Sequence, residues 1–253
     1  MGVSCREMVE TSNMHFKRDA YPMLSVISYG VDDNNNPKKV YNHLLSEIRV
    51  AKDVQFSLAG IKCALETARA TVGPKKCLWV QSDGAESQFW SKEMFHCLPR
   101  FMNNLPAHDY DSIVWFKTVS GHGKGEIDSS HGCVKQDIVR QYNHLGGCGF
   151  DGERLENIGV VDSASQLVNF LQNERKDHFG TLEHKKEDSL GYTLVGRYVS
   201  EYVVDPNFDK QSEKISGSRS YHLVKLIKDE NNQWEERKLL FKKGRLPITV
   251  QEF

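Results

Sequence analysis

The sequence lacks the features of membrane-spanning, secreted and disulfide-rich proteins. Its 253 residues contain no run approaching the ~18 consecutive apolar residues that suggest a membrane helix. Residues 1–19 are polar and of mixed charge, with no apolar segment of the kind found in secretory signals. The six cysteines are scattered without a Cys-x-x-Cys pair, a pattern typical of reduced thiols. We therefore expect an intracellular protein, nuclear or cytoplasmic, with no membrane partner.

The sequence also has no excess of positively charged residues. Lys and Arg number 33 and Asp and Glu number 34, which gives a formal net charge of -1. A module that binds DNA through charge alone is strongly basic, so this class is excluded. A local basic patch can still bind nucleic acid in a chain without net positive charge. The hydrophobic content of 39% is that of an ordinary globular protein with one sizeable core.

The apolar segments predict an α/β layer architecture. Short apolar runs predict strands at 23–29, 77–82, 111–119 and 158–161. Apolar residues at helical spacing predict helices at 38–48, 56–70, 88–101, 128–142 and 164–171. Strands that alternate with helices in this way are typical of α/β domains. Trp79 and Trp115 lie in two of these strands, and we expect both in the core.

The composition changes along the chain and divides it into four segments. Residues 1–22 show no periodicity and predict an N-terminal arm, and residues 23–172 form the α/β core. Residues 173–190 are charged and polar, as in a linker. Residues 191–253 contain short β-like runs separated by turns, which predict a small β-rich module near the lower size limit for independent folding.

Two acidic residues occupy positions where α/β sheets usually build sites. Asp83 directly follows the strand predicted at 77–82, and Asp128 starts a helix after the Gly-rich segment 120–125. The carboxyl ends of the strands of an open α/β sheet meet at one edge, where ligands bind. We therefore single out Asp83 and Asp128 as candidate site residues.

These motifs, in this order, resemble those of a known protein family. Segments 82–89 and 122–128 are similar to the Ser-Asp-Gly motif and the His-Gly-Lys-Gly motif of transposon-derived proteins of the DDE transposase type in animal genomes. Residues 25–45 and 160–170 also resemble the corresponding segments of that family. The resemblance covers roughly residues 23–172 and implies a ribonuclease H-like fold, a mixed sheet flanked by helices.

The resemblance also implies a chemistry. Asp83 and Asp128 would be the second and third carboxylates of a site that binds two Mg²⁺ or Mn²⁺ ions. His122 and Lys124 would contact the phosphate or the leaving oxygen. The implied function is a nuclease or transposase core that acts on DNA phosphodiester bonds, with DNA as its partner and a homo-oligomer as one assembly.

The chain departs from the family pattern at two places. The strand that carries the family's first Asp has no counterpart before residue 23, because Asp19 lacks the surrounding motif. Ser129 follows Asp128 where the family has Gly. These departures suggest an N-terminally truncated or domesticated derivative. A second hypothesis is therefore a non-catalytic nucleic-acid-binding or interaction module that retains the fold, and a third is an unrelated α/β protein.

Simpler interpretations of the same residues stay open. Asp83 with Gly84 is a common turn pair, and Asp128 is a good N-cap for the helix that it starts. The segment 122–125 also fits an ordinary flexible loop.

A zinc site is a competing hypothesis for part of the chain. Its four candidate ligands are His131, Cys133, His144 and Cys148. Their spacing matches no standard zinc finger, so we favour ordinary thiols and surface histidines and expect no zinc.

Overall fold

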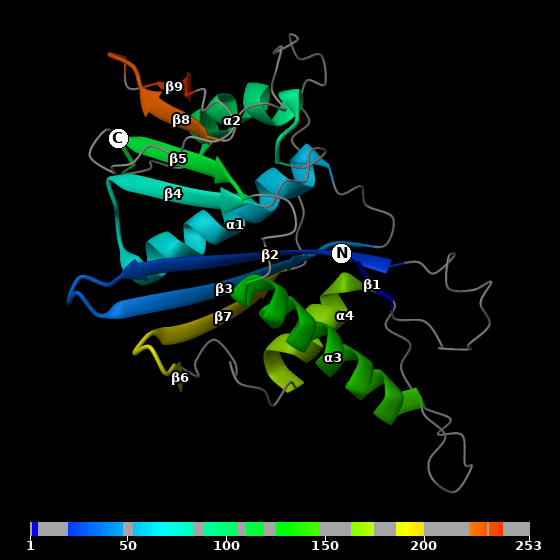
Figure 1. Cartoon of the computed structure of the whole chain (residues 1–253). Coiled ribbons are helices and arrows are strands. Elements are labelled where there is room, and N and C mark those ends of the chain that lie inside the picture. The colour runs from blue at the N-terminus through cyan, green and yellow to red at the C-terminus, as the bar shows by residue number, and fades with distance from the viewer. Residues whose placement is uncertain are drawn as a thin grey trace, which may run out of the picture. The chain divides into compact units, whose positions relative to one another are not determined.

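The computed structural model describes residues 2–4, 20–47, 53–82, 89–105, 110–118, 125–146, 163–174, 186–199, 223–231 and 233–239. The chain divides into two compact units, each built from segments that alternate along the sequence (Figure 1). Unit 1 comprises residues 1–52, 59–73 and 125–203. Unit 2 comprises residues 53–58, 74–124 and 204–253.

Unit 1 contains a five-stranded mixed sheet with the order β1-β2-β3-β7-β6. Its strands are β1 (Gly2–Ser4), β2 (Ala20–Val31), β3 (Pro37–Leu45), β6 (Lys186–Glu187) and β7 (Thr193–Val199). β2 and β3 form an antiparallel hairpin, and β3 runs parallel to β7. The sheet therefore joins the first described segments of the chain to a strand more than a hundred residues later.

The hairpin shows that the helix predicted at 38–48 was wrong, because most of this segment is β3. The Asp32 side chain accepts hydrogen bonds from the backbone N–H groups of Asn34 and Asn36, and Asn35 adopts a positive φ of 63°. This turn directs the chain back along β2. β3 is buried on both of its faces, so its sequence shows no alternation of apolar and polar residues that would indicate a strand.

Helices cover both faces of the unit 1 sheet. α1 (Val54–Val72), whose residues from Ala59 onward belong to unit 1, lies so close to β2 that Gly60 meets the side chain of Leu24. The opposite face packs against α3 (Glu126–Gly146), α4 (Ala164–Asn169) and the π-helical turn η1 (Phe170–Glu174).

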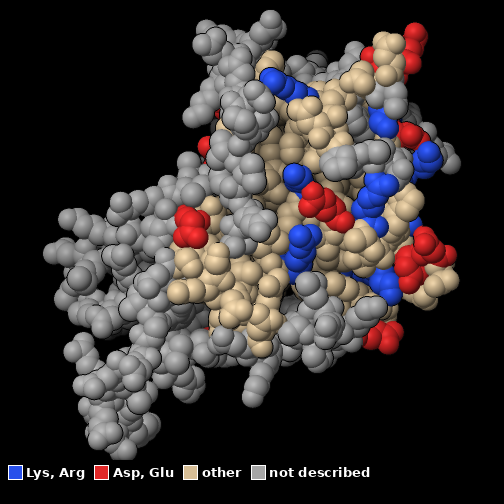
Figure 2. Space-filling view, turned by 180° about the vertical axis from the view of Figure 1, so that it is seen from behind, with Lys and Arg blue, Asp and Glu red and all other residues tan. Residues whose placement is uncertain are grey.

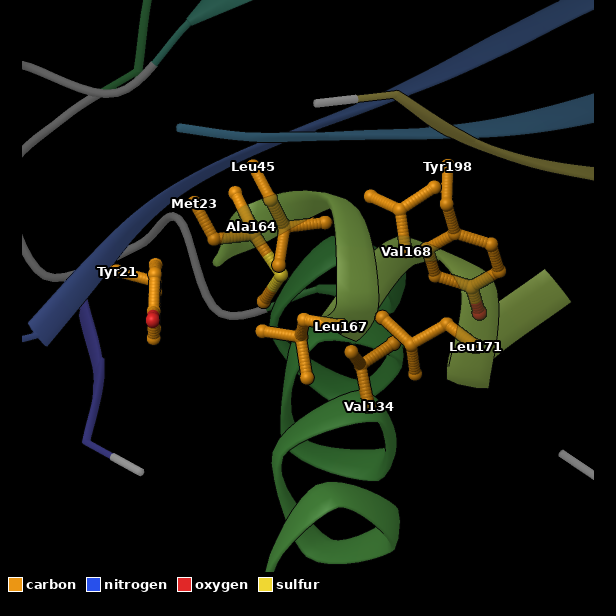
Figure 3. Packing of buried hydrophobic residues seen from close by; sticks show 9 residues of the cluster. All are labelled: Tyr21, Met23, Leu45, Val134, Ala164, Leu167, Val168, Leu171 and Tyr198. Carbon is orange, nitrogen blue, oxygen red and sulfur yellow. The ribbon is translucent and has the colours of Figure 1, made fainter. Parts of the chain in front are cut away.

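The core on this second face is a cluster of buried apolar side chains from the strands and the helices. Figure 3 shows them converging between α3, α4 and the sheet. The cluster consists of Tyr21, Met23, Leu45, Val134, Ala164, Leu167, Val168, Leu171 and Tyr198. Their burial fixes α3 against β2 and β3.

Unit 2 contains a four-stranded mixed sheet with the order β4-β5-β8-β9. The strands are β4 (Cys77–Ser82), β5 (Ser112–Lys117), β8 (Leu223–Lys228) and β9 (Trp234–Leu239). β4 and β5 are parallel, and the other pairs are antiparallel. Helix α2 (Lys92–Asn104) begins after Ser91, whose hydroxyl accepts a hydrogen bond from the backbone N–H of Met94 as an N-cap.

The predicted mixed α/β class is confirmed, as are strands close to those predicted near residues 23, 77 and 111 and helices close to those predicted near 56, 88, 128 and 164. The strand predicted at 158–161 lies outside the described residues. Trp115 is buried as expected, but the prediction for Trp79 was wrong, because its side chain is 49% exposed. Trp79 lies on the exposed face of β4 together with Cys77 and Gln81, because side chains alternate between the two faces of a strand.

Strands β7 and β8 both fall within residues 191–253, the segment predicted as a small module. Yet β7 pairs with β3 and β8 pairs with β5, so each extends a sheet of the segment predicted as the core. The four predicted segment boundaries stay a prediction. Among the described residues, no helix is both long and apolar enough to span a membrane.

Candidate functional site

Of the four predicted site residues, only Asp128 lies within the described residues. Asp83, His122 and Lys124 lie outside them. Asp128 is exposed in the first turn of α3, where its backbone N–H donates a hydrogen bond to the carbonyl oxygen of Gly125 at 3.1 Å. Its carboxylate therefore faces solvent at the positive end of a helix dipole.

The residue that precedes Asp83 is held firmly at the carboxyl end of β4. The Ser82 hydroxyl accepts hydrogen bonds from the indole N–H groups of Trp90 at 3.0 Å and Trp115 at 2.9 Å. The Ser82 carbonyl oxygen accepts from the backbone N–H of Thr118 at 2.9 Å and from its hydroxyl at 3.0 Å. Both polar groups of Ser82 are thus occupied, and the strand ends at a defined position.

The carboxyl end of β5 lies directly beside this strand end. The parallel register pairs Ser82 with Lys117, so the chain leaves both strands at the same edge of the sheet. From this edge the sequence continues to Asp83 on one strand and toward His122 on the other. The Lys117 ammonium lies 5.7 Å from the centre of the Trp90 ring, within the range of a cation–π interaction.

A second polar arrangement, which the sequence analysis missed, surrounds the first residue of α3. Glu126 accepts hydrogen bonds from the Tyr29 hydroxyl at 2.7 Å, from the Tyr41 hydroxyl and from the Lys39 ammonium at 2.9 Å. The same ammonium donates to Asp188 at 2.7 Å. We call these five residues the Lys39 cluster. It joins β2, β3 and the turn before β7 to the start of α3.

The pKa shifts follow from these contacts. Burial alone would lower the pKa of Lys39, but its hydrogen bonds to Asp188 and Glu126 outweigh burial and raise it. Burial would raise the pKa of Glu126, yet the donors around it hold that pKa below its usual value. Burial and the bond to Glu126 raise the pKa of Tyr29 and of Tyr41. At neutral pH the phenols are therefore neutral donors to a charged carboxylate.

The second turn of α3 is tied to the sheet through His43. The Ser25 hydroxyl lies 2.8 Å from His43 Nδ1, and the Ser130 hydroxyl lies 3.3 Å from His43 Nε2. The Ser25 hydroxyl is also 3.2 Å from His131 Nδ1. The His43 ring stacks on Tyr198, with ring centres 5.1 Å apart. These contacts bind α3 to β2, β3 and β7 one turn beyond the Lys39 cluster.

The described residues bear on the zinc hypothesis in part. His131 contacts Ser25, and Cys133 is a free thiol. Cys148 lies outside the described residues, as does the side chain of His144. Across the parts of the chain that the structure describes, no three His, Cys, Asp or Glu side chains are grouped so that they could hold a metal ion.

Sequence reasoning missed the Lys39 cluster because it assigned a helix to residues 38–48. On a strand, Lys39, Tyr41 and His43 share one face, whereas on a helix they would point in different directions. With β3 recognised as a strand, the repeat of polar and aromatic residues at these three positions would have indicated a polar face.

Charges of both signs lie close together on the molecular surface. Figure 2 shows Lys and Arg side chains interspersed with Asp and Glu side chains among the described residues of one face. Electrostatic attraction for a polyanion from that face is therefore local rather than spread over a broad basic surface. No protein-family model, no curated protein and no solved structure matches this chain.

Proposed function

We propose that this chain is a transposon-derived, ribonuclease H-like core of the DDE type, acting on DNA phosphodiester bonds with Mg²⁺ or Mn²⁺. The observation that carries the proposal is the pinned end of β4. Ser82 is fixed by Trp90, Trp115 and Thr118 directly before Asp83. A catalytic carboxylate needs a rigid support of this kind, because small displacements of a reacting group reduce the rate strongly.

The side chains present suit the proposed metal. Carboxylate oxygens are the hard ligands that Mg²⁺ and Mn²⁺ prefer. The ions, when bound, would supply Lewis-acid stabilisation of the phosphate and lower the pKa of a bound water. Asp83 and Asp128 would hold them. His122 and Lys124 would bind the phosphate and stabilise its charge.

The order of elements along the chain is the one that this proposal requires for its two carboxylates. Asp83 follows β4 immediately, and Asp128 lies in the first turn of the helix that comes after β5. The resemblance of the sequence implies these two placements, one carboxylate after a strand and one on a later helix.

A non-catalytic nucleic-acid-binding module is the second candidate. The carboxylates of the Lys39 cluster favour it, because the oxygens of Glu126 and Asp188 already accept hydrogen bonds from the Lys39 ammonium and from neighbouring hydroxyl or backbone N–H groups. Neither offers a free oxygen ligand to replace the family's first Asp. A site with only two carboxylates binds divalent ions more weakly than one with three.

A plasmid-nicking assay with Mn²⁺ separates the two candidates. The proposal predicts nicking by the full chain that Asp83→Asn and Asp128→Asn each abolish. Asp111→Asn is the matched control, because the exposed Asp111 carboxylate pairs with the exposed Lys76 ammonium at 3.4 Å, a contact of little weight. Salt-sensitive DNA binding without nicking would favour the non-catalytic module, and absence of both would contradict the proposal.

A further inference from the structure

The first two turns of α3 are attached to the sheet at residues on both sides of Asp128. Glu126 contacts Tyr29, Tyr41 and Lys39. Four residues later, Ser130 contacts His43. Residues four apart lie on the same side of a helix, whereas a residue midway between them points to the other side. Asp128 is accordingly exposed while Ser130 is buried.

The attachment at Glu126 is unusually well supported for a helix terminus. The Lys39 side chain is only 3% exposed, and it contacts Asp188 in addition to Glu126. Asp188 is itself held by the backbone N–H groups of Leu190 and Tyr192. A side chain at the start of a helix that is fixed by several donors leaves the first turn little freedom to fray.

We infer that the Lys39 cluster is a positioning device, in which Lys39, Tyr29 and Tyr41 fix Glu126 and thereby orient Asp128. This inference rests on the proposed function for what Asp128 binds, but the ordering of the first turn of α3 is independent of it. In this role Lys39, Tyr29 and Tyr41 act through Glu126 and are positioning residues rather than metal ligands.

The double variant Tyr29→Phe/Tyr41→Phe tests the device without changing any charge. Hydrogen exchange of the backbone amides of residues 128–130, the first of the helix with backbone acceptors, measures the order of the first turn. Loss of the phenol donors should accelerate it about fivefold or more, the factor for roughly one net hydrogen bond. Tyr192→Phe is the matched control, because the Tyr192 ring lies near Lys39, 4.9 Å from its ammonium, in the same region. Unchanged exchange in the double variant would overturn the inference.

The affinity of the full chain for Mn²⁺ provides a second measurement, which should not change if the cluster only stabilises the fold. The quantity compared is the factor by which Asp128→Asn weakens Mn²⁺ binding, measured once in wild type and once in the double variant. This factor should be about tenfold smaller in the double variant, the usual effect of losing a residue that orients a metal ligand. An unchanged Asp128-dependent affinity would overturn the positioning role. If Asp128→Asn leaves wild-type affinity unaltered, the proposed function fails, and the exchange experiment alone decides whether the cluster orders the turn.

The variant Lys39→Arg provides a rescue. It keeps the positive charge and the hydrogen-bond donors between Glu126 and Asp188, so exchange at residues 128–130 should stay within about twofold of wild type, less than the factor for one hydrogen bond. Lys39→Met should accelerate it. Unchanged exchange in Lys39→Met, which keeps an apolar chain of similar length but lacks the ammonium, would show that packing of the aliphatic chain, and not the contact to Glu126, orders the turn, which would overturn the inference.

Discussion

At the scale of single residues, Lys39 is the most constrained charge among the described residues. Its ammonium is buried and lies between Glu126 and Asp188. A buried charge is tolerated only when it is paired and hydrogen-bonded, and removing one partner leaves the others uncompensated. The stability of unit 1 should therefore depend on this residue more than on any exposed charge.

Lys39→Met is expected to lower the free energy of unfolding by about 2–3 kcal/mol. This is less than the full cost of breaking a buried pair, because Glu126 is partly exposed. Lys62→Met is the control, since Lys62 forms an exposed pair with Glu66 on α1 and its loss should cost less than about 0.5 kcal/mol. Urea denaturation measures both, and equal effects would contradict the account.

Asp32 should give the β2–β3 turn a dependence on acid pH. The hydrogen bond from the backbone N–H of Asn36 is the largest of the contributions that lower the pKa of Asp32 to about 2. A carboxyl whose folded pKa is depressed stabilises the fold above its unfolded pKa of about 3.9, and this contribution is lost as the pH falls toward 2. Between pH 4 and 2, the melting temperature of the wild type should therefore fall further than that of Asp32→Asn. An equal fall in both proteins would show that the charge of Asp32 does not stabilise the turn.

At the scale of elements, the sequence predicts the strands and helices whose apolar residues follow a clear pattern. The apolar runs of β4 and β5 and the helical spacing of apolar residues in α1 and α3 were sufficient to predict these four elements. β3 was not predictable, because a segment buried on both faces fits a strand or a helix equally well. The contact of Glu126 with Lys39 joins residues 87 positions apart, so no local pattern could reveal it. At the site, the strand that ends directly before Asp83 was foreseen, but the hydrogen bond from Trp90 to Ser82 at its end was not.

Gly60 tests how closely α1 lies against β2. A methyl group at this position would overlap the end of the Leu24 side chain. Gly60→Ala should therefore force the end of the Leu24 side chain to move, at an overpacking cost of about 1 kcal/mol that offsets most of the gain of roughly 1 kcal/mol in helix propensity. Adding Leu24→Ala should remove the overlap, so thermal unfolding of the double variant should show strong non-additivity. Additive effects would mean that the two elements are not in close contact.

At the scale of the whole molecule, both units are completed by strands from the last part of the chain. β7 extends the unit 1 sheet beside β3, and β8 extends the unit 2 sheet beside β5. Contacts between segments so distant in sequence make folding of each unit depend on nearly the entire chain.

Removal of residues 191–253 should consequently prevent cooperative folding. The shortened chain would expose the buried edges of β3 and β5, with apolar residues such as Val40 and Val114 left without their neighbours. Circular dichroism and thermal unfolding of residues 1–190 should show no sharp transition. A cooperative transition like that of the full chain would instead show that residues 191–253 are a separable module.

The most direct test of the proposed function is whether Asp83 and Asp128 each bind divalent metal. Bound Mn²⁺ broadens the NMR signals of nearby amides, so substoichiometric Mn²⁺ added to the full chain should broaden the amides of both residues. Asp83→Asn and Asp128→Asn should each reduce the broadening, whereas Asp111→Asn should leave it unchanged. Broadening at only one of the two residues, or at neither, would contradict the proposal that both carboxylates bind the metal.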